Sequence, residues 1–147
     1  MASVIPNSTK GRLLGDNSQI SSAIDLEADT LKLMLLTSSH SNDIDTQVFI
    51  DDVSTNEIGN SGTYSAGGGT MTVTSSTDDT GNEGVFDASD VAFTSSTITA
   101  RYAVIYKDSG TPATSPIICI IDFGTDQSSS AGTFTISFAI EGIINLG

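Results

Sequence analysis

The side chains that could support catalysis in this 147-residue chain are few and scattered. Histidine occurs once, as His40, in the Ser/Asn/Asp-rich segment 38–43. Nucleophilic catalysis by serine or cysteine needs a base beside the nucleophile, and a lone loop histidine is more often solvated than catalytic. The segment 62–67 has the outline of a nucleophile elbow around Ser65, but Thr63 stands where that turn needs glycine. We therefore expect no catalytic residue and a protein that is not an enzyme.

Clustered carboxylates are the other candidates, either as calcium ligands or as the acid and base of a glycosidase. They form three groups: Asp43 and Asp45; Asp51 and Asp52; Asp78, Asp79 and Glu83. No group has the full spacing of a calcium-binding loop, and the chain has no tryptophan to serve as a platform for sugar. We favour the interpretation that these carboxylates lie in solvated turns, and a calcium-dependent carbohydrate-binding module stays as an alternative function. We expect no cofactor and no metal.

Charge is the strongest feature of the composition. The chain has 18 acidic residues against 5 lysines and arginines, a formal net charge of −13. Such a field repels phosphate backbones and no basic cluster offsets it, so nucleic acid is not an expected partner. No apolar run reaches the roughly 18–20 residues of a membrane helix, and the first residues lack the regions of a signal peptide. We expect a soluble protein without a membrane partner.

Short alternating segments indicate β-strands. Leu31, Leu33 and Leu35 share one face of an expected strand, and Lys32, Met34 and Leu36 share the other. The segment 47–53 is compatible with a short strand or with a helical turn. The triple glycine 67–69 lacks the lysine of a phosphate-binding loop and is expected to be a bend or bulge.

The C-terminal half has the clearest strand patterns. One face of a long strand is expected to hold Ile98, Ala100, Tyr102, Val104 and Tyr106. The run 117–121 is apolar at every position, which predicts a strand covered from two sides and makes Cys119 a small buried hydrophobe. The last expected strand alternates over 133–141. We expect these side chains to be core residues: Val104, Ile120, Phe134, Ile136 and Phe138.

Short strands separated by turn clusters predict an all-β fold, as a single β-sandwich or jelly-roll domain over residues 22–147. Residues 1–21 show neither a strand period nor a helical period and predict an extended N-terminal arm. Lys10 and Arg12 give this arm a positive balance on an acidic chain.

An arm this polar must be ordered by docking, either on its own domain or on a neighbouring chain. The partner-binding candidates are the two basic residues and the apolar residues of the arm: Val4, Ile5, Lys10, Arg12, Leu13 and Leu14. If the arm docks on a partner, its removal should weaken binding and leave the domain's melting temperature nearly unchanged.

Two long blocks, 98–106 and 120–136, resemble small structural proteins of tailed bacteriophages. Shorter blocks at 64–68 and 33–38 extend the resemblance over roughly residues 30–144. The Asp-Phe-Gly at 122–124 is not a kinase motif, because no other kinase signature accompanies it.

The resemblance implies a virion protein made in the host cytoplasm, most specifically a capsid decoration (cement) protein on the head surface. Proteins of that class are small β-rich modules, often trimers, that clamp adjacent capsomers with an extended terminal arm. The implied partner is the major capsid protein or another virion protein. The alternative within the interpretation as a phage protein is a tail or neck component, or an adhesin module for a host surface.

Overall fold

The computed structural model describes residues 2–15 and 23–147, and most of its regular structure is β-strand. The strands are β1 (Ala2–Val4), β2 (Leu31–Leu36), β3 (Gly69–Thr70), β4 (Val73–Asp78), β5 (Glu83–Ala88), β6 (Val91–Lys107), β7 (Ile117–Ile136) and β8 (Ile144–Leu146). The helices are α1 (Asn7–Leu13) and the 3-10 turns η1 (Ile50–Asp52), η2 (Ser54–Asn56) and η3 (Pro112–Thr114). The all-β prediction is confirmed. Among the described residues, no helix is both long and apolar enough to cross a membrane.

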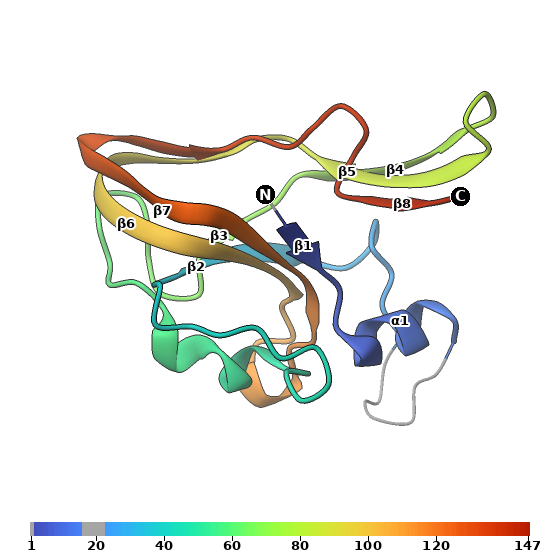
Figure 1. The fold of residues 1–147 in the computed structure, drawn as a ribbon, viewed down its shortest axis with the longest axis horizontal. Helices are drawn as coiled ribbons and strands as arrows, with labels where there is room; N and C mark the ends of the chain where they lie inside the picture. Colours follow the sequence, from blue (N-terminus) through green and yellow to red (C-terminus); the bar gives the residue numbers. More distant parts are fainter. Residues whose placement is uncertain (1, 16–22) are drawn as a thin grey trace.

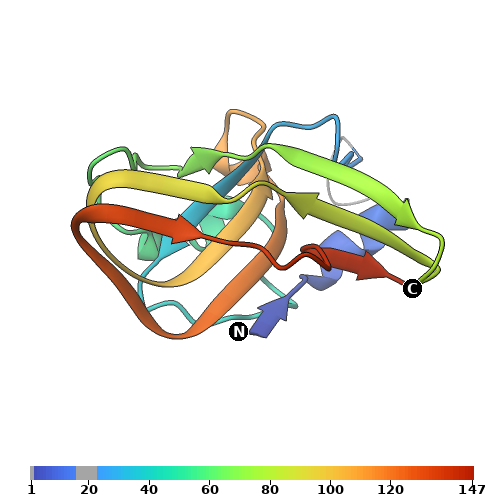
Figure 2. The ribbon, with the colours of Figure 1, turned by 90° about the horizontal axis from the view of Figure 1, so that it is seen from above.

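The strands form two antiparallel sheets. One has five strands in the order β1-β7-β6-β2-β3, and the other has three in the order β4-β5-β8. Figure 1 shows the three-stranded sheet at the upper right, projecting past the five-stranded sheet, with α1 below the three-stranded sheet, and Figure 2 shows the molecule from above.

The long hairpin of β6 and β7 links the two layers. Figure 1 shows both strands curving from the layer that contains β2 into the layer of β4, β5 and β8. Register shifts between Phe93 and Ser96 and between Ser96 and Ile98 mark the bend, and Ser95 lies beside them in a left-handed conformation (φ 52°). Such bulges bend a strand and increase its twist. The hairpin can therefore belong to both layers.

A further register shift corrects the predicted face of β6. Ala100 pairs with Gln127, but Tyr102 pairs with Asp122, so β7 has extra residues at this point. The alternation changes phase here. Ile98 and Ala100 face the core between the layers, whereas Val104 and Tyr106 face the opposite side of the sheet. The five residues predicted to share a face are divided between two cores.

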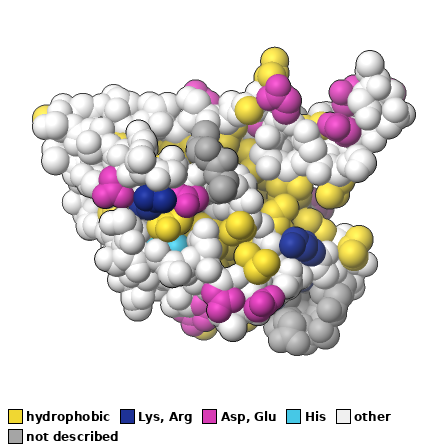
Figure 3. Space-filling view, in the orientation of Figure 1, with side chains coloured by type: hydrophobic (Ala, Val, Ile, Leu, Met, Phe, Trp, Pro, Cys, Tyr) yellow, Lys and Arg dark blue, Asp and Glu magenta, His cyan; other side chains and the backbone are white. Residues whose placement is uncertain are grey.

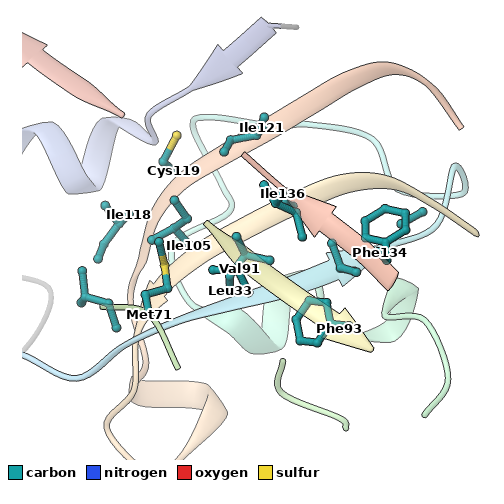
Figure 4. Close-up of a cluster of buried hydrophobic side chains, with 14 of the residues drawn as sticks. Leu33, Met71, Val91, Phe93, Ile105, Ile118, Cys119, Ile121, Phe134 and Ile136 are labelled. Atoms are coloured by element: carbon teal, nitrogen blue, oxygen red, sulfur yellow. The ribbon is translucent and has the colours of Figure 1, made fainter. Parts of the chain in front are cut away.

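The larger core fills the space between the layers. Leu33 of β2, Phe93 of β6 and Ile121 of β7 contribute to it (Figure 4). Cys119 belongs to this core as predicted, and burial raises the pKa of its thiol to about 12. Leu31, Leu33 and Leu35 all belong to this core, whereas Met34 and Leu36 face the other side of the sheet, so the two faces predicted for 31–36 are confirmed.

The smaller core lies on the other face of the five-stranded sheet. It contains Met34, Ile117 and Ile120, and it is covered by Ile50 of η1 and by Val53. Within the segment 47–53, which was compatible with a strand or a helical turn, Ile50–Asp52 form a 3-10 turn and Phe49 forms an isolated β-bridge with Pro116. The prediction that 117–121 is covered from two sides is confirmed, because its residues divide between the two cores.

The predicted C-terminal strand is too long. Phe134 and Ile136 are buried as expected, but β7 ends at Ile136, Phe138 is only half-buried and Ile140 is 95% exposed. The reason is pairing: Ile136 lies opposite Val91, the first residue of β6, so no β6 residue remains to pair with later positions. The chain turns at Gly142 (φ 89°) and enters β8.

The prediction of an extended N-terminal arm without regular structure is wrong for its described part. Ala2–Val4 form an edge strand on β7, with Val4 opposite Ile120, and Asn7–Leu13 form a helix. Pro6 precedes the helix, and proline is tolerated at helix starts because its missing N–H is not needed there. Residues 16–21 of the predicted arm lie outside the described residues.

Candidate partner-binding surface

The N-terminal segment, residues 2–14, is the predicted partner-binding element, and it docks on its own domain. β1 adds to the edge of β7. The backbone N–H of Asn7 donates to the carbonyl of Ile44 at 3.0 Å, and the Thr9 hydroxyl donates to the carbonyl of Ile117. The segment was expected to dock either on its own domain or on a neighbouring chain, and in the structure it docks on its own domain.

Arg12 is the most deeply placed of the predicted binding residues. Its side chain is 3% exposed, and the guanidinium carbon lies 5.4 Å from the ring centre of Phe49. A cation over an aromatic face is attracted by the ring's electron density. Arg12 therefore contributes to attaching α1 and is not presented to a partner.

The other five predicted residues divide by exposure. Val4 and Ile5 are half-buried, Val4 against the smaller core and Ile5 against the larger. Lys10 is exposed and donates a 3.3 Å hydrogen bond to Asn7, and Leu14 is 90% exposed. Only Lys10 and Leu14 remain well presented at the surface.

Leu13 belongs to an apolar hollow that the sequence did not reveal. The hollow has a volume of about 180 Å³ and lies between α1 and the three-stranded sheet. Leu26, Phe86 and Leu146 are among its other lining residues. Figure 3 shows hydrophobic side chains exposed in this region, below the sheet and beside the helix.

His40, predicted to be solvated, is buried. Its side chain is 4% exposed, its ring lies edge-on to Tyr102 with the centroids 5.0 Å apart, and Nε2 is 2.9 Å from Asn42 Oδ1. Burial lowers the pKa of the imidazole, because the charged form loses its hydration. The residue acts as a neutral part of the packing around β6.

Acidification should destabilise the fold through His40. The unfolded histidine has a pKa of about 6.5, and the folded one is lower. Below pH 6.5 the unfolded chain binds the proton first, so the free energy of unfolding should fall as the pH drops from about 6.5 through the folded pKa. Urea unfolding between pH 7.5 and 5.5 should show this decrease, and His40→Gln should flatten it. An equal slope in the two proteins would contradict the assignment.

The carboxylates considered as calcium ligands accept hydrogen bonds from their own turns. Asp43 accepts from the backbone N–H groups of Asp45 and Thr46, and hydrogen bonds from this turn lower its pKa. Asp52 accepts from the N–H groups of Val48 and Phe49, at 2.8 and 2.9 Å. Within the described residues, no group of three or more His, Cys, Asp or Glu side chains is placed to hold a metal ion.

The region around Ser65 is a tightly fastened loop. The Tyr64 hydroxyl donates to Glu57 at 2.8 Å and accepts from the backbone N–H of Leu35 at 3.0 Å. Burial is the main cause that raises the pKa of Tyr64 well above its usual range. Glu57 also accepts from the N–H of Gly67 at 2.6 Å, and Tyr106 donates to the Gly67 carbonyl. These bonds hold the glycine bend against β2 and β6.

A larger hollow of about 430 Å³ follows the curved part of β7. Its lining residues are Phe123, Gln127, Ser128, Thr133, Phe134, Thr135, Ile136 and Ser137. None of them is ionisable, so this hollow offers hydroxyl, amide and apolar contacts and no acid or base.

Comparisons with protein-family models, with curated proteins and with solved structures found no match for this chain.

Proposed function

We propose that this chain is a structural protein of a phage particle, a capsid decoration protein that binds and stabilises the head shell. The observation that carries the proposal is the pairing of the two blocks of the family resemblance. Residues 98–106 lie in β6 and residues 120–136 lie in β7, and the two blocks pair over part of their length, with Val104 opposite Ile120 and Ile98 opposite Ser129. The resemblance thus falls on the hairpin that belongs to both layers.

The chemistry of the described residues supports binding in preference to catalysis. His40 is buried in contact with Tyr102 and Asn42, and Cys119 is a buried thiol with a raised pKa. A nucleophile needs an accessible base or a lowered pKa. We therefore propose a non-enzymatic β-sandwich module whose work is done by its surfaces.

The proposed partner is the major capsid protein or another virion protein, and a trimer is the favoured assembly. Lys10 and Leu14 are the members of the predicted binding set that can contact a partner without release of the N-terminal segment. The net charge of −13 favours a partner surface with basic groups.

The test is the copy number of this chain in particles purified from the phage that encodes it. Quantitative gel densitometry against the major capsid protein should give hundreds of copies per particle for a decoration protein. A few copies would instead identify a neck or tail component, and absence from the particle would refute the virion proposal.

A further inference from the structure

The longest edge strand of the described sheets is β4. The edge strands β1, β3 and β8 contain three, two and three residues, whereas β4 contains six. Thr74 to Asp78 are all exposed. An exposed edge strand presents unpaired backbone N–H and C=O groups, to which another extended chain can bind.

The hydrogen-bond phase identifies the outward-facing groups of β4. The backbone N–H of Ser89 donates to the carbonyl of Thr72 at 2.9 Å, so these two residues are a hydrogen-bonded pair. Along an antiparallel ladder, hydrogen-bonded pairs alternate with pairs that are not hydrogen-bonded. The backbone groups of Thr74 and Ser76 therefore face β5, and those of Val73, Ser75 and Thr77 face outward. Phe86 lies opposite Ser75, and its carbonyl accepts a 2.7 Å hydrogen bond from the backbone N–H of Ile143. This carbonyl therefore points away from β4, which agrees with the outward direction of the Ser75 groups.

β4 itself lacks three common protections against an added strand, namely lysine, proline and a bulge. Proteins commonly place lysine, proline or a bulge on an exposed edge. β4 contains no lysine or proline, and its register with β5 is continuous from Val73 to Asp78. Its valine and threonines favour strand pairing.

A hollow and a set of acids lie beside the edge. The apolar hollow of about 180 Å³ is lined in part by Ser75 and Ser76 of β4. Apolar cavities of about 150 Å³ accept a molecule the size of benzene, so this hollow has room for an aliphatic side chain. Glu27 accepts a 2.6 Å hydrogen bond from the Ser75 hydroxyl. β4 and β5 carry three acidic residues, and no lysine or arginine occurs in β4, β5 or β8.

We propose that β4 binds an extended, basic segment of a partner protein as an added strand. Main-chain hydrogen bonds would form with Val73, Ser75 and Thr77, an aliphatic side chain would enter the hollow, and Lys or Arg side chains would meet the acids. This is strand addition with a side-chain pocket. A second copy of this chain fits less well, because two β4 edges would bring together two acidic surfaces without a base. The inference does not depend on the partner being a capsid protein.

The probe is a synthetic seven-residue peptide that alternates lysine with valine and leucine, added to the full chain and followed by NMR and amide hydrogen exchange. We expect binding that protects the N–H groups of Ser75 and Thr77. A peptide with glutamate in place of lysine should bind at least about tenfold more weakly.

Three variants at Thr77 test the geometry. Thr77→Pro removes an outward N–H and no bond to β5, so it should weaken binding of the basic peptide at least about tenfold. Thr77→Ala keeps the N–H and should change binding less than about threefold. Thr77→Lys keeps the backbone and adds a repelling charge, so it should weaken binding even if Thr77→Pro does not fold.

Four results would overturn the proposal. The first is that the basic peptide does not bind, and the second is that the acidic peptide binds equally well. The third is that the basic peptide protects amides from hydrogen exchange at another surface. The fourth is that light scattering shows a dimer in which the Ser75 and Thr77 amides are protected without peptide.

Discussion

Replacing Gly68 by alanine should remove a large part of the stability of this fold. Gly68 has φ 77°, and a Cβ atom built there would lie 1.8 Å from the carbonyl oxygen of Leu33. That oxygen belongs to a buried residue of β2, and the loop is fastened by Glu57 and Tyr64, so neither side can move away freely. A left-handed alanine costs about 1–3 kcal/mol, and overpacking adds about 1–3 kcal/mol.

The free energy of unfolding should therefore fall by about 2–6 kcal/mol, out of the about 5–15 kcal/mol typical of a domain. Urea unfolding with linear extrapolation measures this loss. Gly110→Ala is the matched control, because Gly110 has φ 82° but no atom within 4 Å of the added Cβ. The control should lose only the cost of the conformation, about 1–3 kcal/mol, without the added cost of overpacking. Equal losses in the two variants would show that the contact with Leu33 does not limit the loop.

Deleting residues 1–13 should destabilise the domain, in contrast to the behaviour expected of an arm that docks on a partner. The deletion removes β1 from β7 and uncovers Ile120. It also removes the half-buried Val4 and Ile5, each of which contributes about 1 kcal/mol at half burial, and the contact of Arg12 with Phe49. We expect a loss of about 2–4 kcal/mol and a decrease in melting temperature of roughly 5–15 °C.

Lys10→Ala combined with Leu14→Ala is the control for the deletion. Both side chains are exposed, so the double variant should stay within about 0.5 kcal/mol of the wild-type stability. Thermal unfolding of the three proteins at one concentration separates the effects. A deletion variant with the wild-type melting temperature would mean that the N-terminal segment does not stabilise the domain, and it would favour a segment that is free to bind a partner.

The two proposed contact surfaces can be separated by variants, although Leu13 of α1 also lines the hollow beside β4. The deletion of residues 1–13 changes both surfaces, whereas Thr77→Lys changes only β4 and the Lys10/Leu14 double variant changes only α1 and its end. The double variant should therefore bind the basic peptide like the wild type.

The amino-acid sequence alone predicted the features that depend on local alternation. The faces of Leu31–Leu36, the two-sided burial at 117–121 and the buried Cys119 follow from residue types along one strand, because successive side chains point to opposite faces. The glycine bend at 67–69 was also predicted, since only glycine adopts its φ values without strain.

Features set by distant segments were decided only by the tertiary structure. The change of phase in β6 depends on the extra residues of β7 opposite Ala100 and Tyr102, and β7 ends at Ile136, opposite the first residue of β6. His40 is buried because Tyr102 packs against it, 62 positions along the chain. α1 is attached through contacts such as Thr9 with Ile117, which lie 108 positions apart.

The candidate surfaces depend on topology in the same way. The residues of the N-terminal segment suggested an arm because their apolar side chains have no period of their own, but β7 offers them an edge. In the sequence, nothing distinguishes the serine- and threonine-rich segment of β4, Val73–Asp78, from a strand that is paired on both sides. Its free edge exists because β5 pairs with it on one side and no described strand lies on the other, and strand order is not encoded in the alternation of a single segment.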